Sequence, residues 1–258
     1  MSDLSKPRVV AIIPARFAST RFPGKIIAPL EGHPLVYHTW RRASEARLVE
    51  RVLVATDSEA VVSALSPYPI EIVMTRADHA TGTDRIAEVA RGLDADIVVN
   101  VQGDEPLIAP SAIDAVVQPL LDDPRLQMST ARRRIVNPKA VDDPNVVKVI
   151  CDGRDRALYF SRLPIPYIRD AGDRCASPGS HWQHIGLYVY RRSFLLAFSE
   201  MPQTPLETLE KLEQLRALEH GHSIAVIETD YEVIGVDVPS DLDDVRELLQ
   251  QRAAKEEE

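Results

Sequence analysis

Cysteine is scarce in this chain, with only Cys151 and Cys175 among 258 residues. Two cysteines exclude a disulfide framework and a cysteine-rich zinc site. The sequence also lacks any run close to the ~18 apolar residues of a membrane-spanning helix, and residues 1–8 lack the apolar core of a signal peptide. These absences predict a cytoplasmic protein that does not insert into membranes.

Positive charge is in deficit, with 30 Lys and Arg against 39 Asp and Glu, a formal net charge of −9 and a pI near 5.3. This balance argues against non-specific binding to nucleic acid or to an anionic membrane. Local clusters of Arg and Lys are therefore interpreted as sites for small anions. Hydrophobic residues make up 45% of the chain, which is typical of a globular protein of one large or two small domains.

Short β-branched runs alternate with longer amphipathic stretches in the first half of the chain. This spacing predicts right-handed crossovers and a mostly parallel sheet, and the nearly all-apolar runs predict helices on both of its faces. The predicted strands are 9–13, 52–56, 70–74 and 96–102, and the predicted helices are 34–46, 58–65, 83–92 and 110–121.

The pattern changes after about residue 126, where short strands at 146–150 and 185–190 are separated by loops. We interpret this stretch as an insertion packed on the sheet. A continuous helix is predicted over 205–220, because Thr204 and Glu207 form a capping-box pattern at its start. Its glutamates at 207, 210 and 213 are expected on one polar side. A last helix is predicted from Pro239 to about Gln250.

The loop after the first strand, PARFASTRFPGK, carries three cations and two hydroxyls: Arg16, Arg21, Lys25, Ser19 and Thr20. Ligands of parallel sheets bind beyond the carboxyl ends of the strands, and charge-assisted bonds from such groups suit a polyphosphate. Neither a Walker loop nor a G-x-G-x-x-G motif is present. From charge alone, a solvated basic loop is an equal alternative.

The segment MTRADHATGTDR, which ends at Arg85, leads from a strand into a helix for which Thr83 is the expected N-cap. A helix N-terminus offers N–H groups to an anion or to the polar edge of a base. The alternative is simple capping, with Arg76, Asp78 and Arg85 in surface ion pairs. His79 has no ligand-spaced partner nearby, so a structural role is predicted for it.

The apolar run DIVVN ends in QGDEP, which places Asp104 and Glu105 at the carboxyl end of a strand. Adjacent side chains point in opposite directions from an extended backbone, so one of the two faces a site. Asp237 follows another apolar run and precedes a helix that begins at Pro239. If Asp104 and Asp237 meet, they suit Mg²⁺ together with substrate phosphates and water. Alone, each is more typical of a turn or a helix cap.

Three later segments carry groups that suit an acidic sugar. YFSRLPIPYIRD contains Arg162 and Arg169, which suit a carboxylate. The polar side chains that suit a polyhydroxylated ring are Gln102, His184, Tyr188, Glu213 and Gln214. From the residues alone, His184 is more typical of a structural histidine, Arg162 of an ordinary ion pair and the glutamates of a solvated face.

These blocks, from Val9 to Leu248, resemble in order and separation those of the Kdo cytidylyltransferase (CMP-Kdo synthetase) family. The resemblance implies a Rossmann-like, glycosyltransferase-A-type α/β fold, usually homodimeric, that transfers CMP from CTP to the eight-carbon acidic sugar Kdo with Mg²⁺ and releases pyrophosphate, for lipopolysaccharide or capsule. We therefore expect a single domain over 1–258. Its nucleotide-binding part covers about 8–125 and 222–252, and its inserted sugar-binding and dimer-forming part covers about 126–221.

The resemblance also implies a role for individual residues. Nucleotide binding is implied for Ala15, Arg16, Lys25, Arg76, Thr81, Gly82 and Asp104. Sugar binding is implied for Arg21, Gln102, Arg162, Arg169, His184, Tyr188, Glu213 and Gln214. The implied metal ligands are Asp104 and Asp237, which form the catalytic set with Lys25.

Two departures from the family pattern keep a related acid such as 8-amino-Kdo open as the substrate. Gln183 precedes His184 where a basic residue is frequent, and Val238 follows Asp237 where Thr is usual. A nucleotide-sugar-dependent glycosyltransferase is one rival, but it would normally show Asp-x-Asp where this chain has Gly-Asp-Glu. A binding module without turnover is the other, and the intact aspartates and Lys25 argue against it.

Overall fold

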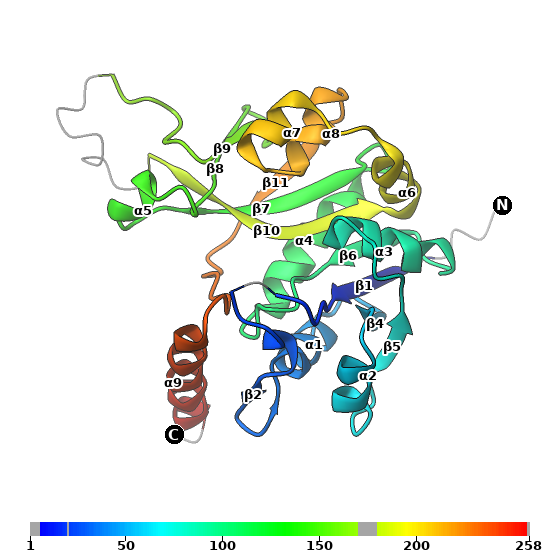
Figure 1. Ribbon diagram of the computed structural model, residues 1–258. Helices are drawn as coiled ribbons and strands as arrows, with labels where there is room; N and C mark the ends of the chain where they lie inside the picture. Colours follow the sequence, from blue (N-terminus) through cyan, green and yellow to red (C-terminus); the bar gives the residue numbers. More distant parts are fainter. Residues whose placement is uncertain (1–5, 20, 170–179, 257–258) are drawn as a thin grey trace. The chain divides into compact units, whose positions relative to one another are not determined.

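Figure 1 shows a computed structural model of the chain, which describes residues 6–19, 21–169 and 180–256. The chain divides into two compact units. The first unit contains residues 1–114 and 233–258, and the second unit contains residues 115–232. The expectation of a single domain with an insertion stays a prediction.

A parallel sheet in the order β6-β1-β4-β5 forms the core of the first unit. Its strands are β1 (Val9–Pro14), β4 (Arg51–Thr56), β5 (Glu71–Met74) and β6 (Ile97–Asn100). β1 is flanked on both sides, because Val10 pairs with Arg51 of β4 and Val9 pairs with Ile97 of β6. Every residue of β6 is buried, which is expected of a strand covered on both faces.

The helices that connect these strands lie on opposite faces of the sheet. The chain moves from β1 to β4 and β5 through α1 (Leu35–Ser44) and α2 (Glu59–Leu65), then returns to β6 through α3 (Gly82–Arg91). Because right-handed crossovers that travel in opposite directions place their helices on opposite faces, α3 lies across the sheet from α1 and α2 (Figure 1). This reversal creates a topological switch point beside β1, where ligands of such sheets bind.

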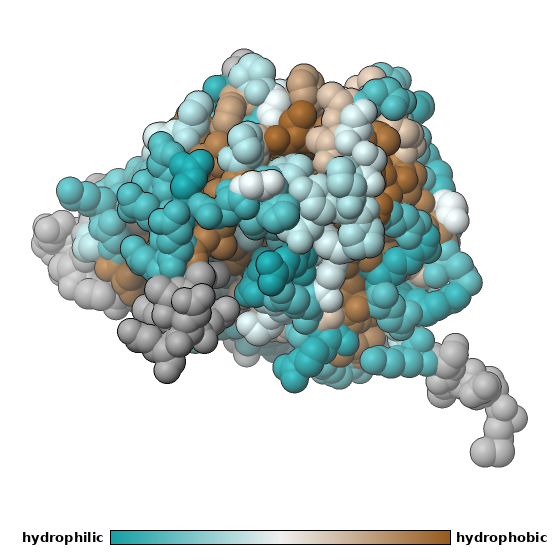
Figure 2. Space-filling model, turned by 90° about the horizontal axis from the view of Figure 1, so that it is seen from below, coloured by the Kyte–Doolittle hydropathy of each residue, from teal (hydrophilic) through white to brown (hydrophobic). Residues whose placement is uncertain are grey.

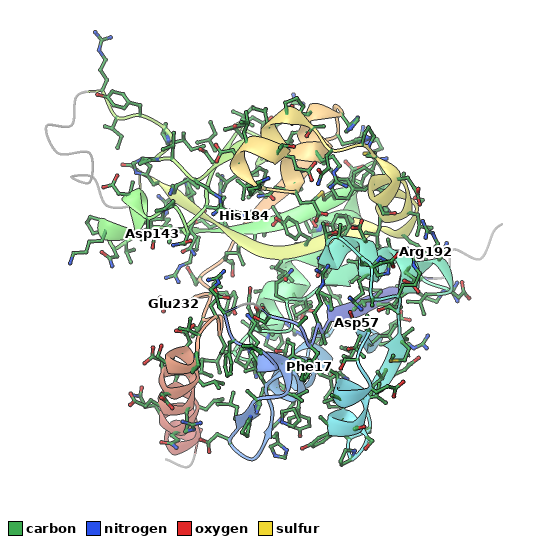
Figure 3. The ribbon with its side chains drawn as sticks, viewed as in Figure 1. Phe17, Asp57, Asp143, His184, Arg192 and Glu232 are labelled. Atoms are coloured by element: carbon green, nitrogen blue, oxygen red, sulfur yellow. The ribbon has the colours of Figure 1, made fainter. Side chains whose placement is uncertain are left out.

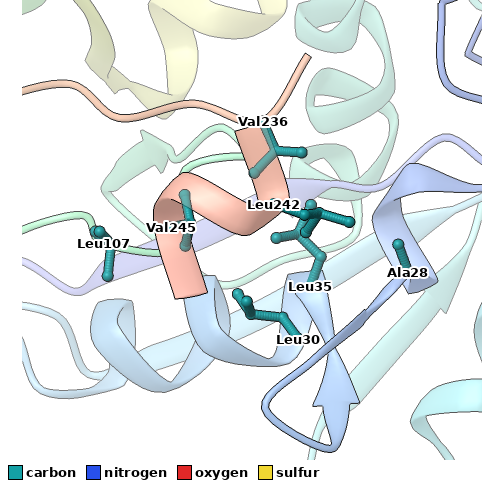
Figure 4. Packing of buried hydrophobic residues seen from close by; sticks show 7 residues of the cluster. All are labelled: Ala28, Leu30, Leu35, Leu107, Val236, Leu242 and Val245. Atoms are coloured by element: carbon teal, nitrogen blue, oxygen red, sulfur yellow. The ribbon is translucent and has the colours of Figure 1, made fainter. Parts of the chain in front are cut away.

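The strands and helices predicted over 9–121 are confirmed, each end within two residues, and the helix predicted at 110–121 is α4 (Pro110–Asp122). The last helix begins at Pro239 as predicted but ends at Glu256, about six residues beyond the predicted end near Gln250. The last helix, α9 (Pro239–Glu256), packs on α1 and on the hairpin of β2 (Pro29–Leu30) and β3 (His33–Pro34). Figure 4 shows the buried cluster of Ala28, Leu30, Leu35, Leu107, Val236, Leu242 and Val245. Because Asp237 lies directly after Val236, this packing positions the backbone of Asp237.

The second unit contains a mixed sheet. In it, β7 (Met128–Arg134) pairs antiparallel with β10 (Trp182–Arg191) and parallel with β11 (Ile224–Glu228). β8 (Lys148–Cys151) pairs antiparallel with β10 and with β9 (Ala157–Ser161). The strands predicted at 146–150 and 185–190 correspond to β8 and β10. The remaining helices of this unit are α5 (Lys139–Asp142), α6 (Arg192–Glu200), α7 (Pro205–Glu210) and α8 (Gln214–Glu219).

The prediction of one continuous helix over 205–220 is wrong. The chain breaks between α7 and α8 at Lys211, whose φ of 54° is left-handed. The Glu207 carboxylate accepts from the backbone N–H of Thr204 at 3.3 Å, as in a capping box, but it also binds the Arg216 guanidinium, with an Nε–Oε2 distance of 2.8 Å. Glu207 is therefore buried and does not lie on a solvated face, because the fold-back of α8 brings Arg216 onto it.

Hydrophilic residues occupy most of the face shown in Figure 2, and hydrophobic residues appear between them in small groups. Across the described part of the chain, no helix is both long and apolar enough to cross a bilayer. Of the two cysteines, Cys151 is a free, partly buried thiol whose pKa is raised by burial, and Cys175 lies outside the described residues.

Candidate active site

A cavity of about 250 Å³ opens in the first unit beyond the carboxyl ends of β1 and β6. Its lining comes from the loop after β1, the turn after β6 and the start of α3. The lining residues are Pro14, Arg16, Ala18, Ser19, Lys25, Ile26, Gly82, Gln102, Gly103 and Asp104. The three segments expected to hold the nucleotide and the metal therefore meet at the switch point.

Lys25 is the centre of this site. Its ammonium donates to Asp104 Oδ2 at 2.7 Å, to the Val236 carbonyl at 2.7 Å and to Asp237 Oδ1 at 3.2 Å. The Lys25 side chain is only 11% exposed, whereas those of Asp104 and Asp237 are 31% and 58% exposed. The structure thus brings the three residues of the expected catalytic set together, although no strand immediately precedes Asp237.

The backbone holds the two carboxylates together independently of Lys25. The Val236 N–H donates to the Asp104 carbonyl at 2.9 Å. The Asp241 carboxylate accepts from the N–H groups of Asp237 and Val238 at 2.7 and 3.0 Å, which fixes the turn into α9. Asp241 is absent from the predicted site residues, although an acidic third residue in a helix that begins at Pro239 is a recognisable capping signal.

Thr39 and Gly103 shape the turn that carries Asp104. The buried hydroxyl of Thr39, on α1, donates to the Gly103 carbonyl at 3.0 Å. A Cβ at position 103 would lie 2.9 Å from the Pro14 carbonyl oxygen and 3.0 Å from Ile26 Cδ1, so only glycine fits there. Thr39 is absent from the predicted site residues, because a threonine on a helix face carries no local signal for a partner 64 residues away.

The other cations of the first loop are held by different partners. Arg16 Nη1 lies 3.4 Å from the Ala80 carbonyl, and Arg21 Nη1 lies 3.1 Å from Asp237 Oδ2. Gly24 has a φ of 71°, which gives the loop its left-handed turn before Lys25. Thr20, whose hydroxyl was also expected here, lies outside the described residues.

Two further predicted residues are held by the sheet. Ala15 is fully buried, and its N–H donates to the Ala55 carbonyl at 2.8 Å. Gln102 lines the cavity, with its Nε2 3.4 Å from Asn100 Oδ1. In the described part of the chain, the residues that line the cavity do not include Ala15, Arg76 or Thr81.

Thr81, and not the expected Thr83, caps α3. Its hydroxyl accepts from the Asp84 N–H at 3.1 Å, and its own N–H donates to the Asp84 carboxylate at 3.0 Å. Thr83 instead lies inside the first turn and is buried. The reciprocal capping leaves the Thr81 hydroxyl hydrogen as a donor directly before Gly82, which lines the cavity.

Arg85 is not in the surface ion pair considered for it. It is fully buried, donates from Nη2 to Asp57 Oδ2 at 2.9 Å and also bonds the Thr75 hydroxyl. Asp57, labelled in Figure 3, follows β4, so Arg85 ties α3 to two strand ends. The ring of His79 bonds Glu88, and the structural role of this histidine stays a prediction.

Arg76 lies at the surface, as expected if the segment only caps the helix and Arg76 forms a surface ion pair. Its side chain is 66% exposed and lies 3.6 Å from Asp78 and 3.7 Å from Glu88. The predicted nucleotide residues thus fall into two groups. Arg16, Lys25, Gly82 and Asp104 line the cavity, whereas Arg76 lies on a neighbouring surface and its role stays a prediction.

In the second unit, β10 brings together two of the residues expected to bind the sugar. The strand is irregular between Ile185 and Tyr188, where its register to β7 shifts. The centres of the His184 and Tyr188 rings, which come from either side of this irregularity, lie 5.4 Å apart. His184, labelled in Figure 3, is buried, and its Nε2 lies 3.0 Å from the Thr130 hydroxyl.

Burial determines the titration of this pair. Desolvation lowers the pKa of His184 to about 3, so the ring is neutral at physiological pH. Desolvation, followed by the negative charge of Glu213, raises the pKa of Tyr188, so its phenol keeps its proton. Glu213 precedes α8, and Gln214 is its first residue, with a side-chain Nε2 that is buried without a hydrogen-bond partner. The neutral ring, the phenol and the amide together can donate and accept hydrogen bonds to hydroxyl groups.

The Arg162 side chain is hydrogen-bonded to main-chain carbonyls of the second unit. Its guanidinium donates to the carbonyls of Glu210, Pro144 and Lys211 at 2.7, 2.8 and 3.4 Å. The buried Lys148 ammonium in turn donates to the Arg162 carbonyl at 2.6 Å. Arg162 is therefore bound to main-chain oxygens and not in the ordinary ion pair considered for it. Arg169 is exposed, at the last described residue before position 180.

Comparison with known proteins agrees with this fold. A solved structure of a CMP:2-keto-3-deoxy-manno-octonic acid synthetase in complex with CTP matches with a TM-score of 0.89 and 39% identity, over 95% of this chain and 99% of that one. A glucose-1-phosphate thymidylyltransferase of Bacillus anthracis matches with a TM-score of 0.65 at 15% identity, which shows the fold alone. The fold is therefore that of the α/β nucleotidyltransferases, with a mostly parallel sheet.

Sequence comparison narrows the class. A family model described as cytidylyltransferase matches residues 10–224. The 3-deoxy-manno-octulosonate cytidylyltransferase of Solibacter usitatus is 49% identical over 94% of both chains, and that of Pelobacter propionicus is 54% identical over 93% of this chain and 96% of its own. The chain belongs to the cytidylyltransferase family, among the 3-deoxy-manno-octulosonate (Kdo) cytidylyltransferases.

Proposed function

We propose that this chain transfers CMP from CTP to the anomeric hydroxyl of Kdo, giving CMP-Kdo and pyrophosphate for lipopolysaccharide biosynthesis in the cytoplasm. The observation that carries the proposal is the contact of Lys25 with both Asp104 and Asp237, since Lys25 and Asp104 line the switch-point cavity. The relatives above carry this activity in their names, and the sequence match extends over almost the whole length of both chains.

The residues around the cavity support the nucleotide half of the reaction. Arg16 and Lys25 supply positive charge for the triphosphate, and the start of α3 supplies N–H groups and the Thr81 hydroxyl for the cytosine or ribose. The sugar hydroxyl attacks the α-phosphorus in line with the departing pyrophosphate. No covalent enzyme nucleophile is required, because positioning and charge neutralisation account for most catalysis of phosphoryl transfer.

Asp104 and Asp237 have the donor chemistry that Mg²⁺ requires. Among the described residues, no cluster of three or more His, Cys, Asp or Glu side chains could hold a metal ion alone. Two carboxylates fit Mg²⁺ nevertheless, because this ion commonly completes its shell with substrate phosphates and water. The chemistry that bound magnesium supplies is a lower pKa of the attacking hydroxyl and neutralisation of charge on the α-phosphate.

The sugar half of the proposal concerns the side chains of each unit by itself. In the second unit, the rings of His184 and Tyr188 lie 5.4 Å apart, and the charge of Glu213 acts on Tyr188. Together with Gln214, the residue after Glu213, these polar side chains suit the hydroxyls of Kdo. Arg169 supplies positive charge for its carboxylate, and Arg162 positions the loops around these side chains. In the first unit, Gln102 and Arg21 are the proposed sugar contacts.

We also propose a homodimer formed through the second unit. Large hydrophobic side chains are exposed there, with Leu163, Tyr167 and Leu209 at 70%, 68% and 78%. Contiguous exposed apolar side chains are typical of an interaction surface, and Leu163 and Tyr167 line the same hollow of the second unit. Light scattering coupled to size-exclusion chromatography would give a dimer mass for the wild type and a monomer mass for Leu163→Ser/Tyr167→Ser. A monomeric wild type would contradict the dimer.

The test of the function measures pyrophosphate release from CTP and Mg²⁺ with Kdo, 8-amino-Kdo, sialic acid or no sugar. Kdo-dependent release is expected, and it should fall at least a hundredfold in Asp104→Asn and Asp237→Asn. Asp243→Asn, an exposed aspartate of α9, is the matched control and should keep wild-type release. Release with another acid alone would overturn the substrate, and no release with any sugar would overturn the transfer.

A further inference from the structure

The Lys25 ammonium occupies the position between the two carboxylates that the metal needs. An ammonium has three N–H donors and no acceptor, and here the three donors meet three oxygens at 2.7, 2.7 and 3.2 Å. In this arrangement Lys25 has no donor left for a phosphate. Its proposed role toward the triphosphate therefore requires that the ammonium leave the carboxylates.

The charges of the two carboxylates and of their two ion-pair partners balance without a metal. Asp104 and Asp237 contribute two negative charges, and Lys25 and Arg21 contribute two positive ones through direct ion pairs. A divalent cation gains little from a neutral cluster in which both carboxylates already have partners. A triphosphate reverses this balance, because it draws the two cations toward its own oxygens and leaves the carboxylates for the metal.

The carboxylates do not depend on Lys25 for their proximity. The Val236 N–H binds the Asp104 carbonyl, and Asp241 fixes the turn that carries Asp237. Val236 is also buried in the hydrophobic cluster under α9. Removal of the ammonium should therefore leave both carboxylates in place, with Asp104 without its ammonium partner and Asp237 still paired with Arg21.

We propose that Lys25 competes with the metal ion for Asp104 and Asp237, and that CTP relieves this competition by taking Lys25 onto its phosphates. This inference rests on the proposed function, and it adds to it the order in which the nucleotide and the metal bind. The nucleotide-free site disfavours the metal, and nucleotide and metal then bind cooperatively because one ammonium changes partners.

The test is direct metal binding without turnover. Mn²⁺ binding is measured by electron paramagnetic resonance, and Mg²⁺ binding by calorimetry, on the nucleotide-free protein. Lys25→Met is expected to bind Mn²⁺ about tenfold more tightly than the wild type, because the carboxylates lose their charged hydrogen-bond donor. The same variant should bind metal-free CTP about tenfold more weakly. A general structural defect would weaken both ligands, so the opposite signs identify the exchange.

Three variants make the result decisive. Lys25→Gln has a similar length without the charge and should tighten Mn²⁺ binding in the same direction if Lys25→Met does not fold. Lys25→Met/Asp104→Asn should lose the gain in Mn²⁺ affinity, and Lys139→Met, which changes a lysine of α5 in the second unit, should behave as the wild type.

If Asp104→Asn weakens metal binding but neither Lys25 variant strengthens it, the proposed exchange of Lys25 between the carboxylates and CTP is wrong, and the proposed metal ligands are retained. If Asp104→Asn and Asp237→Asn leave metal binding unchanged even with CTP, the metal assignment in the proposed function is wrong and the exchange falls with it.

Discussion

The buried hydroxyl of Thr39 donates a 3.0 Å hydrogen bond to the carbonyl oxygen of Gly103, the residue before Asp104. This bond links α1 to the turn that presents a proposed metal ligand. A carbonyl that loses its partner in a buried setting costs free energy, and a shifted turn misplaces the carboxylate. Thr39 is therefore a positioning residue for the site.

Thr39→Val should remove this bond while it keeps the shape of the side chain. We expect a loss of about 1–3 kcal/mol in the free energy of unfolding. We also expect a higher Mg²⁺ concentration for half-maximal activity, because Asp104 is less well held. Urea unfolding and the Mg²⁺ dependence of kcat/KM measure the two effects. Thr39→Ser keeps the hydroxyl and should restore the Mg²⁺ dependence, and a Val variant with unchanged Mg²⁺ dependence would remove the positioning role.

Gly103→Ala tests the same turn from the other side. The new Cβ would lie 2.9 Å from the Pro14 carbonyl oxygen, a backbone atom of β1 that cannot move away cheaply. The turn must shift instead, and a displacement of about 1 Å can cost on the order of a hundredfold in rate. We expect kcat/KM for CTP to fall by about that factor. Gly153→Ala is the matched control, since a Cβ there has no described atom within 4 Å, and it should keep wild-type kinetics.

The sequence was sufficient to predict the strands of the first unit, because nearly all-apolar runs such as 9–13 and 96–100 are typical of parallel strands buried on both faces. It also placed Lys25, Asp104 and Asp237 in one site through family resemblance. It could not give the partner of the ammonium, because an ion pair between positions 25 and 237 depends on how α9 packs. The fold-back at Lys211 was missed for the same reason. Local helix signals favour continuity there, and only the tertiary pair of Glu207 and Arg216 favours the break.

That pair provides a third prediction. The side chains of Arg216 and Glu207 are only 5% and 6% exposed, so removal of one partner leaves a buried, uncompensated charge. Arg216→Met should therefore lower the free energy of unfolding by about 3–5 kcal/mol. Glu207→Leu/Arg216→Met removes both charges and should recover part of the loss. As a control, Arg246→Met breaks an exposed pair with Asp243 and should cost less than about 1 kcal/mol. Chemical denaturation measures all three, and equal losses for Arg216→Met and Arg246→Met would contradict the prediction.

His184 should make the stability of the protein depend on pH. Its folded pKa is about 3, because the ring is buried, whereas an unfolded histidine titrates near pH ~6.5. The Thr130 hydroxyl lies 3.0 and 2.9 Å from the carbonyls of Ile185 and Leu187, so its single hydrogen is used there and the His184 ring is the donor to its oxygen. This bond fits a neutral ring with its hydrogen on Nε2.

The direction of this pH dependence follows from the protons that His184 binds in the folded and in the unfolded state. Above pH ~6.5 the ring is neutral in both states, and its contribution to stability is complete. Below that pH the histidine is protonated in the unfolded chain but not in the folded protein. Each further pH unit therefore lowers the free energy of unfolding by about 1.4 kcal/mol, until the folded pKa is reached. Between pH 7.5 and pH 5 the wild type should lose about 2 kcal/mol more than His184→Phe, whose ring does not titrate. Urea unfolding of both proteins at the two pH values measures this difference. Equal losses would show that the His184 ring does not carry the pH dependence.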